Sequence, residues 1–133
     1  MKFMLMMNAP RGDGDWNVKN WTMEELKAHV GFMKKFAQAL KSEGALVAAE
    51  GLAQPGAARI VRASKKDGAP EVTDGPFAEA KEFLAGYWIV DVETPEEAYA
   101  IAARASAAPG IDGKPLGILI EVRQVMSAPP PQQ

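Results

Sequence analysis

The chain has 133 residues, of which 47% are hydrophobic and 24% charged, a composition typical of one globular domain with its own core. Its formal net charge of −2 provides no basic surface for nucleic acid, and the absence of cysteine excludes disulfides and cysteine-ligated metals. No apolar run approaches the roughly 20 residues that cross a bilayer, and the N-terminal apolar segment is too short for a signal peptide. We therefore expect a cytoplasmic protein that binds neither membranes nor nucleic acid.

The first part of the sequence predicts a β-α-β unit. Residues 2–8 are apolar and predict a strand, residues 9–20 predict a polar loop, and residues 45–53 predict a second strand. The segment between the loop and the second strand has the period of a helix.

This first helix has clear start and stop signals. Thr22 is the expected N-cap, Glu25 its capping-box partner, and Trp21 and Leu26 a hydrophobic staple. Gly44 is expected to end the helix. Spacings of three and four predict a buried stripe made of Met23, Leu26, Val30, Met33, Ala37 and Leu40.

A hairpin and a second β-α-β unit follow. Residues 58–64 and 70–73 predict two short strands joined by a turn at Asp67-Gly68. Residues 83–92 predict a longer strand, after which Thr94 is the N-cap of a second helix that stops before Pro109. The last strand is expected at residues 116–125.

The order of these elements predicts an α+β fold of the ferredoxin-like type, an antiparallel sheet with two helices on one face and a β-hairpin insert. One domain covers residues 1–126, and residues 127–133 are a proline-rich tail. The strands at 2–8 and 83–92 are apolar on both faces, although the helices cover only one. We therefore expect a homodimer, in which a second copy covers the other face and leaves a cleft at the interface.

Three stretches, "EGLAQPGAARIVR", "VTDGPFAEAKEFLAGYWIVDV" and "EVRQV", resemble the DGPF-type branch of the YCII-related family over roughly residues 1–126. The resemblance implies a dimeric α+β barrel. Relatives include a dehydrochlorinase of a ring substrate, and a histidine near the start of the first helix is suspected to act in YCII-type members. His29 resembles that histidine. Many DGPF-branch members are encoded near alternative sigma factors, which implies a regulatory link.

His29 and Asp74 are the candidate catalytic residues, and each has a second interpretation. His29 is the single histidine, and histidine is the side chain that titrates near neutral pH, so it is the natural general acid or base. Equally, it can be a half-exposed residue beside the apolar stripe. Asp74 could orient His29 or a substrate, or its carboxylate could only close an Asx-type turn in Thr73-Asp74-Gly75-Pro76. In that turn Gly75 is expected to adopt a backbone conformation closed to other residues.

Glu50, Tyr87 and Trp88 are the candidate ligand-binding residues. Glu50 interrupts a small apolar strand, which indicates either a wet cavity or an ion pair or edge position. Tyr87 and Trp88 point to opposite faces of their strand, so one side chain faces the helices and the other the expected partner. Core packing is the alternative for both aromatic residues.

No metal or cofactor is expected. Asp13, Asp15, Asn17 and Glu24 approach the spacing of a calcium loop, but Val18 stands where the loop needs glycine. Three functions are left open: a small-molecule binder or enzyme that uses His29, a regulatory protein linked to a sigma factor, and a purely structural dimer.

Overall fold

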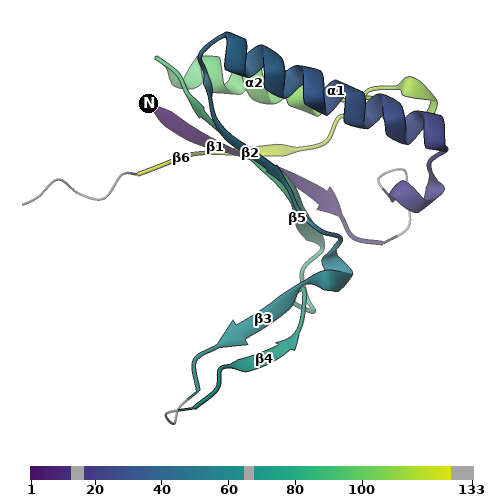
Figure 1. Ribbon diagram of the computed structural model, residues 1–133, viewed down its shortest axis with the longest axis vertical. Coiled ribbons are helices and arrows are strands. Elements are labelled where there is room, and N and C mark those ends of the chain that lie inside the picture. Colours follow the sequence, from purple (N-terminus) through teal and green to yellow (C-terminus); the bar gives the residue numbers. More distant parts are fainter. Residues whose placement is uncertain (13–16, 65–67, 127–133) are drawn as a thin grey trace, which may run out of the picture.

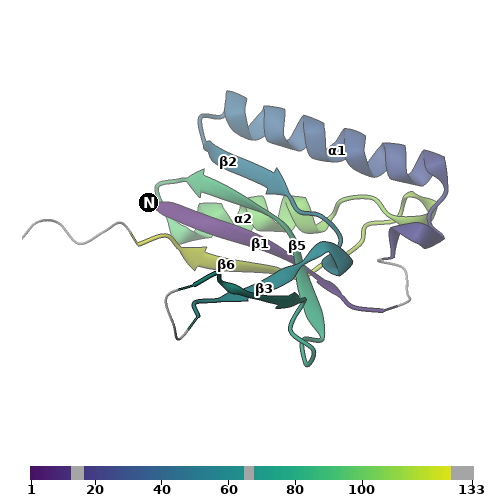
Figure 2. The same ribbon diagram turned by 60° about the horizontal axis from the view of Figure 1, so that its bottom comes forward.

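The computed structural model of the protein describes residues 1–12, 17–64 and 68–126. Its main body is a four-stranded sheet with two helices on one face, and a separate two-stranded hairpin projects from the side opposite the helices (Figure 1; Figure 2). The sheet strands are β1 (Lys2–Pro10), β2 (Leu46–Gly51), β5 (Glu82–Asp91) and β6 (Ile120–Gln124). The helices are α1 (Met23–Ser42) and α2 (Pro95–Ser106), and the hairpin consists of β3 (Arg59–Arg62) and β4 (Glu71–Asp74).

The strand order in the sheet is β2-β5-β1-β6, and all three neighbouring pairs are antiparallel. This order places β5 between β1 and β2, as in a split β-α-β unit. The predicted ferredoxin-like fold is therefore confirmed. Within the described part of the chain, no helix has the length and hydropathy needed to cross a bilayer.

The two ends of α1 form as the sequence predicts. Thr22 Oγ1 accepts a hydrogen bond from the backbone N–H of Glu25 at 3.1 Å, and Glu25 Oε1 accepts one from the N–H of Thr22 at 2.8 Å. At the other end Gly44 has a φ of 76°, and its N–H donates to the carbonyl of Lys41. The next N–H donates to the carbonyl of Leu40, which completes a Schellman motif.

The predicted core stripe of α1 is wrong at two positions. Met23 and Val30 are 69% and 42% exposed. Met33 and Leu40 of the predicted stripe do pack on the core, but the face that meets the sheet also carries Phe32 and Phe36. Phe36 packs edge-on against Trp88 with ring centroids 5.6 Å apart. Several apolar stripes at helical spacing are present in this segment, and the large aromatic side chains occupy the buried one because they remove the most apolar area from water.

The two faces of the sheet differ in what covers them. On the helix side, Phe3 and Leu5 of β1 and Trp88 and Val90 of β5 are buried beneath α1 and α2. The other face carries two cross-strand rows, which the strand register defines. One row is Ala48–Ile89–Met4–Arg123, and the other is Glu50–Tyr87–Met6–Glu121. We call these eight residues the open face.

The last strand is shorter than predicted. β6 begins at Ile120, whereas the sequence predicts a strand from residue 116. The N–H groups of Leu116 and Gly117 donate instead to the carbonyls of Ala108 and Ser106 at the end of α2, and Gly117 has a φ of 63°. These contacts hold residues 116 and 117 against the end of α2, so the strand begins only at Ile120.

The hairpin makes few contacts outside itself. Val61 of β3 and Val72 of β4 face each other across the ladder and are 60% and 56% exposed. Arg62 and Glu71 form an exposed ion pair of 2.8 Å beside them. The turn predicted at Asp67-Gly68 lies partly outside the described residues.

Candidate functional site

His29 lies in the helical layer, half-buried between α1 and the loop that follows α2. Its Nδ1 is 3.0 Å from the carbonyl oxygen of Pro109, and its ring meets Trp21 edge-on at a centroid distance of 5.3 Å. A carbonyl oxygen only accepts, so Nδ1 carries the proton in this contact and Nε2 keeps its lone pair in the neutral ring. Among the described residues, no hydrogen bond joins His29 to a carboxylate.

Asp74 lies elsewhere, at the end of β4 in the projecting hairpin (Figure 1). Its side chain is 93% exposed and lies 3.6 Å from the guanidinium of Arg59, the residue opposite it in the hairpin. The structure therefore does not bring His29 and Asp74 together within one protomer. Their proposed catalytic roles stay predictions.

The three candidate ligand-binding residues separate between the two faces of the sheet. Glu50 lies exposed on the edge strand β2, which is the edge position that the sequence left open, and it stands opposite Tyr87 on the open face. Trp88 is buried in the core against Phe36. Of the three, only Glu50 and Tyr87 can meet a ligand or partner on the open face.

The loop that His29 contacts is also held by Glu25. Oε2 of Glu25 accepts a hydrogen bond of 2.6 Å from the backbone N–H of Asp112, while Oε1 caps α1. The N–H groups of Thr22 and then Asp112 stabilise the charged carboxylate, and they lower the pKa of Glu25 from its ordinary 4.5.

Replacing Glu25 by Gln is expected to make the stability of the protein depend less steeply on pH in the acid range. Because the folded-state pKa lies below the unfolded value, charged Glu25 stabilises the fold fully above about pH 4.5, and this contribution is lost as the pH falls through the folded pKa. Melting temperatures measured from pH 6 to pH 2.5 should fall less steeply for Glu25→Gln than for the wild type. Identical slopes would show that the carboxylate gains nothing from these two amides.

The turn after β4 is fixed by a residue from the far end of β1. Nη1 of Arg11 donates to the carbonyl oxygens of Phe77 at 3.1 Å and Ala80 at 2.9 Å, and the Arg11 N–H donates to the carbonyl of Lys81. The candidate residues chosen from the sequence did not include Arg11. Its partners are backbone carbonyls, so no side-chain pattern in the sequence points to it.

Two depressions meet beneath this turn. One, of about 490 Å³, is lined by residues that include Arg11, Lys19, Gln54 and Phe83. The other, of about 400 Å³, is lined by residues that include Leu52, Phe77, Phe83 and Leu84. Gln54, Pro55, Pro76 and Phe83 line both, so the two depressions share a wall.

Gly75 lines the first of these two depressions. Glycine is favoured at this position, but not for the reason that the sequence predicts. Its φ is not positive, so the expectation of a backbone conformation closed to other residues is wrong. A Cβ at this position would instead lie 3.2 Å from the carbonyl carbon and from Cβ of Ala58, whose carbonyl accepts the Gly75 N–H. Glycine is favoured here by the close approach of β4 to the start of β3.

Gly75→Ala is accordingly expected to lower the free energy of unfolding by about 1 kcal/mol, because the added methyl group must push Ala58 aside. Gly56→Ala is the matched control, since a Cβ there meets no atom within 4 Å. Urea unfolding of both variants measures the difference. Equal midpoints for Gly75→Ala and the wild type would show that the two segments separate at no cost.

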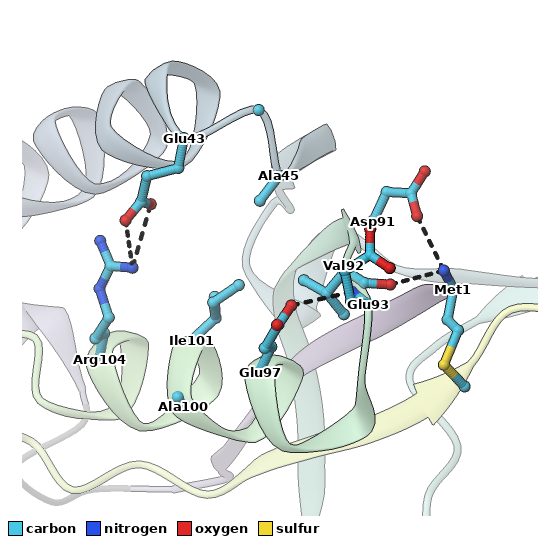
Figure 3. Close-up of a pocket in the computed structure, with 11 residues that line it drawn as sticks. Met1, Glu43, Ala45, Asp91, Val92, Glu93, Glu97, Ala100, Ile101 and Arg104 are labelled. Carbon is cyan, nitrogen blue, oxygen red and sulfur yellow. Dashed lines mark hydrogen bonds and ion pairs between the residues drawn. The ribbon is translucent and has the colours of Figure 1, made fainter.

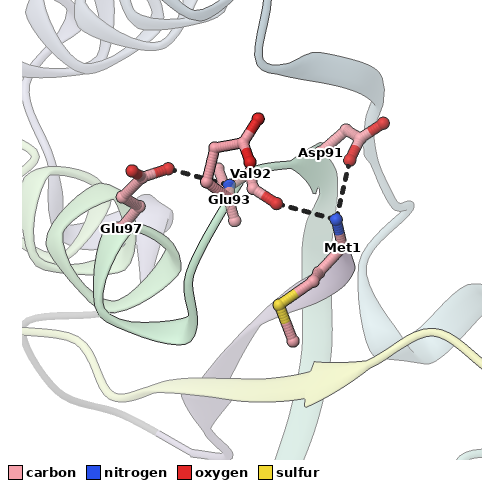
Figure 4. Close-up of polar contacts among 5 residues, drawn as sticks. All are labelled: Met1, Asp91, Val92, Glu93 and Glu97. Atoms are coloured by element: carbon pink, nitrogen blue, oxygen red, sulfur yellow. Dashed lines mark hydrogen bonds and ion pairs between the residues drawn. The ribbon is translucent and has the colours of Figure 1, made fainter.

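A third depression, of about 560 Å³, lies between the end of α1 and the start of α2 (Figure 3). Most of the charged groups that line it have partners within it. The ammonium group of Met1 is 3.1 Å from Asp91 and donates to the carbonyl of Val92, as Figure 4 shows, and Glu97 accepts from the N–H of Glu93. Arg104 is paired with Glu43 at 3.2 Å across the same depression. These contacts join the ends of the two central strands, cap α2 and link α2 to α1, so we assign the depression a structural role.

No group of three or more His, Asp or Glu side chains within the described ranges could hold a metal ion. Asp13 and Asp15 of the rejected calcium template lie outside those ranges. We take the pair of depressions under the turn as the candidate ligand site.

The sequence model of the YCII-related domain matches residues 1–111. The chain belongs to the YCII-related family. The match covers the sheet strands β1, β2 and β5, both helices and the hairpin, and it ends before β6. No curated protein matches this YCII-related chain. The family match gives no site and no reaction, so the chemistry must be argued from the residues.

Proposed function

We propose that this YCII-related protein is a homodimer that binds a small organic ligand. The open face of the sheet is buried between the two copies, and the ligand occupies the depressions beneath the turn at Asp74–Phe77. The four residues Asp-Gly-Pro-Phe at this turn favour the DGPF-type branch of the family.

The observation that carries the proposal is the distribution of side chains on the open face. Met4, Met6, Tyr87 and Ile89 form its centre on the two middle strands, whereas Glu50, Glu121 and Arg123 lie on the edge strands. An apolar centre with a charged rim is the usual anatomy of a protein interface. Covering such a face with a second, identical face is favourable, because apolar surface is removed from water.

The hairpin gives independent support. An isolated two-stranded hairpin is at best marginally stable in water. Here β3 and β4 lie on the helix-free side of the sheet (Figure 1), where a second copy would lie, and they expose Val61 and Val72. Contact with that copy supplies the packing that the hairpin does not find in its own protomer.

The proposal is for binding rather than for a reaction within one protomer, because His29 and Asp74 lie on separate elements with separate partners. His29 keeps an unprotonated Nε2 when its ring is neutral, so it stays a candidate base for a later test. No specific observation in the structure favours the regulatory alternative.

Native mass spectrometry of the purified protein tests the proposal directly. We expect a dimer that carries a small additional mass, and we expect that mass to be lost when the same sample is denatured. Protein that has been unfolded, dialysed and refolded is the control, because it should form the dimer without the additional mass. A monomer, with or without an additional mass, would contradict the proposal.

A further inference from the structure

The two depressions under the Asp74–Phe77 turn differ in chemistry although they share a wall. We call the one at Arg11 and Lys19 the polar half and the one at Leu52 and Phe77 the apolar half. Gln54, Pro55, Pro76 and Phe83 line both halves, so the halves adjoin and a ligand that lies across these residues can contact both.

The polar half carries two cationic side chains with unused donors. Nη1 of Arg11 is engaged by the carbonyls of Phe77 and Ala80, which fixes the guanidinium group in place. Its Nε and Nη2 donate to no acceptor in the described part of the protein, and neither does the ammonium group of Lys19 or the side-chain amide of Gln54. A fixed guanidinium fork beside a flexible ammonium group is well suited to an anion with planar oxygens.

No acidic side chain is among the described residues that line the polar half. An anion bound there would therefore meet two cations without a competing carboxylate in its lining. Charge-assisted hydrogen bonds of this kind are roughly twice as strong as those between neutral groups.

The apolar half is lined mainly by carbon. Phe77 is 69% exposed, and Leu52, Phe83 and Leu84 complete a wall that an aromatic ring or branched chain could cover. Glu82 is the single charged residue among those that line it. Exposed aromatic and aliphatic side chains beside a few polar groups are typical of small-molecule sites.

From this arrangement we infer that the ligand is an organic carboxylate, with its charged end at Arg11 and Lys19 and its ring or branched chain against Leu52 and Phe77. The inference rests on the proposed ligand-binding function and names the ligand class. The volumes of the two halves, about 490 and 400 Å³, each accommodate one end of such a molecule.

Two probes of the same shape separate charge from apolar contact. The ¹⁵N-labelled protein is titrated with 2-naphthoate and, separately, with the uncharged 2-naphthamide, and amide shifts are followed by NMR. We expect 2-naphthoate to bind about tenfold more tightly and to move the amide signals of Gly12, Gly56 and Gly75, which line the polar half.

The ammonium group of Lys19 forms no hydrogen bond or ion pair with a described residue, and Lys19→Gln keeps the backbone N–H that donates to Asn17, so the fold should not change. This variant should bind 2-naphthoate about three- to fivefold more weakly, with 2-naphthamide binding unchanged. Lys34→Gln, on the exposed side of α1, is the matched control and should change neither affinity.

Equal affinity of the wild type for the two probes would overturn the assignment of the ligand as a carboxylate. So would an equal loss of 2-naphthoate affinity in Lys19→Gln and Lys34→Gln. Ligand binding as such would then still stand, since the uncharged probe would be bound at the same amides. Failure of both probes to move any signal near Gly75 would overturn the assignment together with the proposed site.

Discussion

Replacing Gly86 by Ala should lower the free energy of unfolding by about 2 to 3 kcal/mol. Gly86 is buried on the helix side of β5, where it pairs with Gly51 of β2 and with Met7 of β1. A Cβ on Gly86 would lie 2.9 Å from the carbonyl oxygen of Glu50, which is a rigid backbone atom in the adjoining strand. The strands β2 and β5 must therefore separate locally to admit one methyl group.

Gly51→Ala provides the control across the same ladder. Gly51 is exposed, and a Cβ at this position meets no atom within 4 Å. Its replacement should change the free energy of unfolding by less than about 0.5 kcal/mol. The added methyl group points into solvent, and its other effect is to reduce the conformational freedom of the unfolded chain. Guanidinium unfolding followed by tryptophan fluorescence measures both variants. Similar midpoints for the two would show that the close contact at Gly86 does not constrain the sheet.

Met6→Asp should convert the proposed dimer into a monomer at micromolar concentration. Met6 lies in the centre of the open face, between Tyr87 and Glu121, so a second copy on this face would bury it. Two unpaired carboxylates would then lose their hydration, at a cost of about 3 kcal/mol or more. The dimer dissociation constant should rise by roughly 100-fold or more.

Tyr99→Asp is the matched control, because Tyr99 is an exposed residue of α2 in the opposite layer. It introduces the same charge without touching the open face, so it should sediment as the wild type does. Circular dichroism should confirm that both variants are folded. If Met6→Asp and Tyr99→Asp sediment alike, the open face is not the dimer interface.

Local sequence signals predicted the elements and their order well. Capping chemistry at Thr22 and Glu25, the stop at Gly44 and the N-cap at Thr94 depend on neighbours within a few residues, and all are present in the structure. The alternation of faces in β5 was also predictable, because the period of a strand is two. These features need no knowledge of distant contacts.

Features that depend on distant contacts were predicted less well. The buried stripe of α1 is determined by Trp88 and the rest of the sheet, and nothing within the helix separates Phe36 from Met23. The start of β6 is determined by hydrogen bonds from residues 116 and 117 to the end of α2.

The candidate site was the hardest part to predict. Sequence reasoning paired His29 with Asp74 because each is chemically suited to acid–base work, but the fold places one in the helical layer and the other in the hairpin. Arg11 was missed because its partners are backbone carbonyls of residues 77 and 80, and such contacts leave no pattern in side-chain sequence. The shared wall of the two depressions likewise joins three separate segments of the chain.

Sedimentation equilibrium of the wild-type protein at micromolar concentration tests the central claim most directly, since burial of the open face requires a second copy. The account predicts a single species with twice the mass of one chain, in low salt and in 0.5 M salt alike, because the centre of the interface is apolar. A stable monomer under these conditions would contradict it.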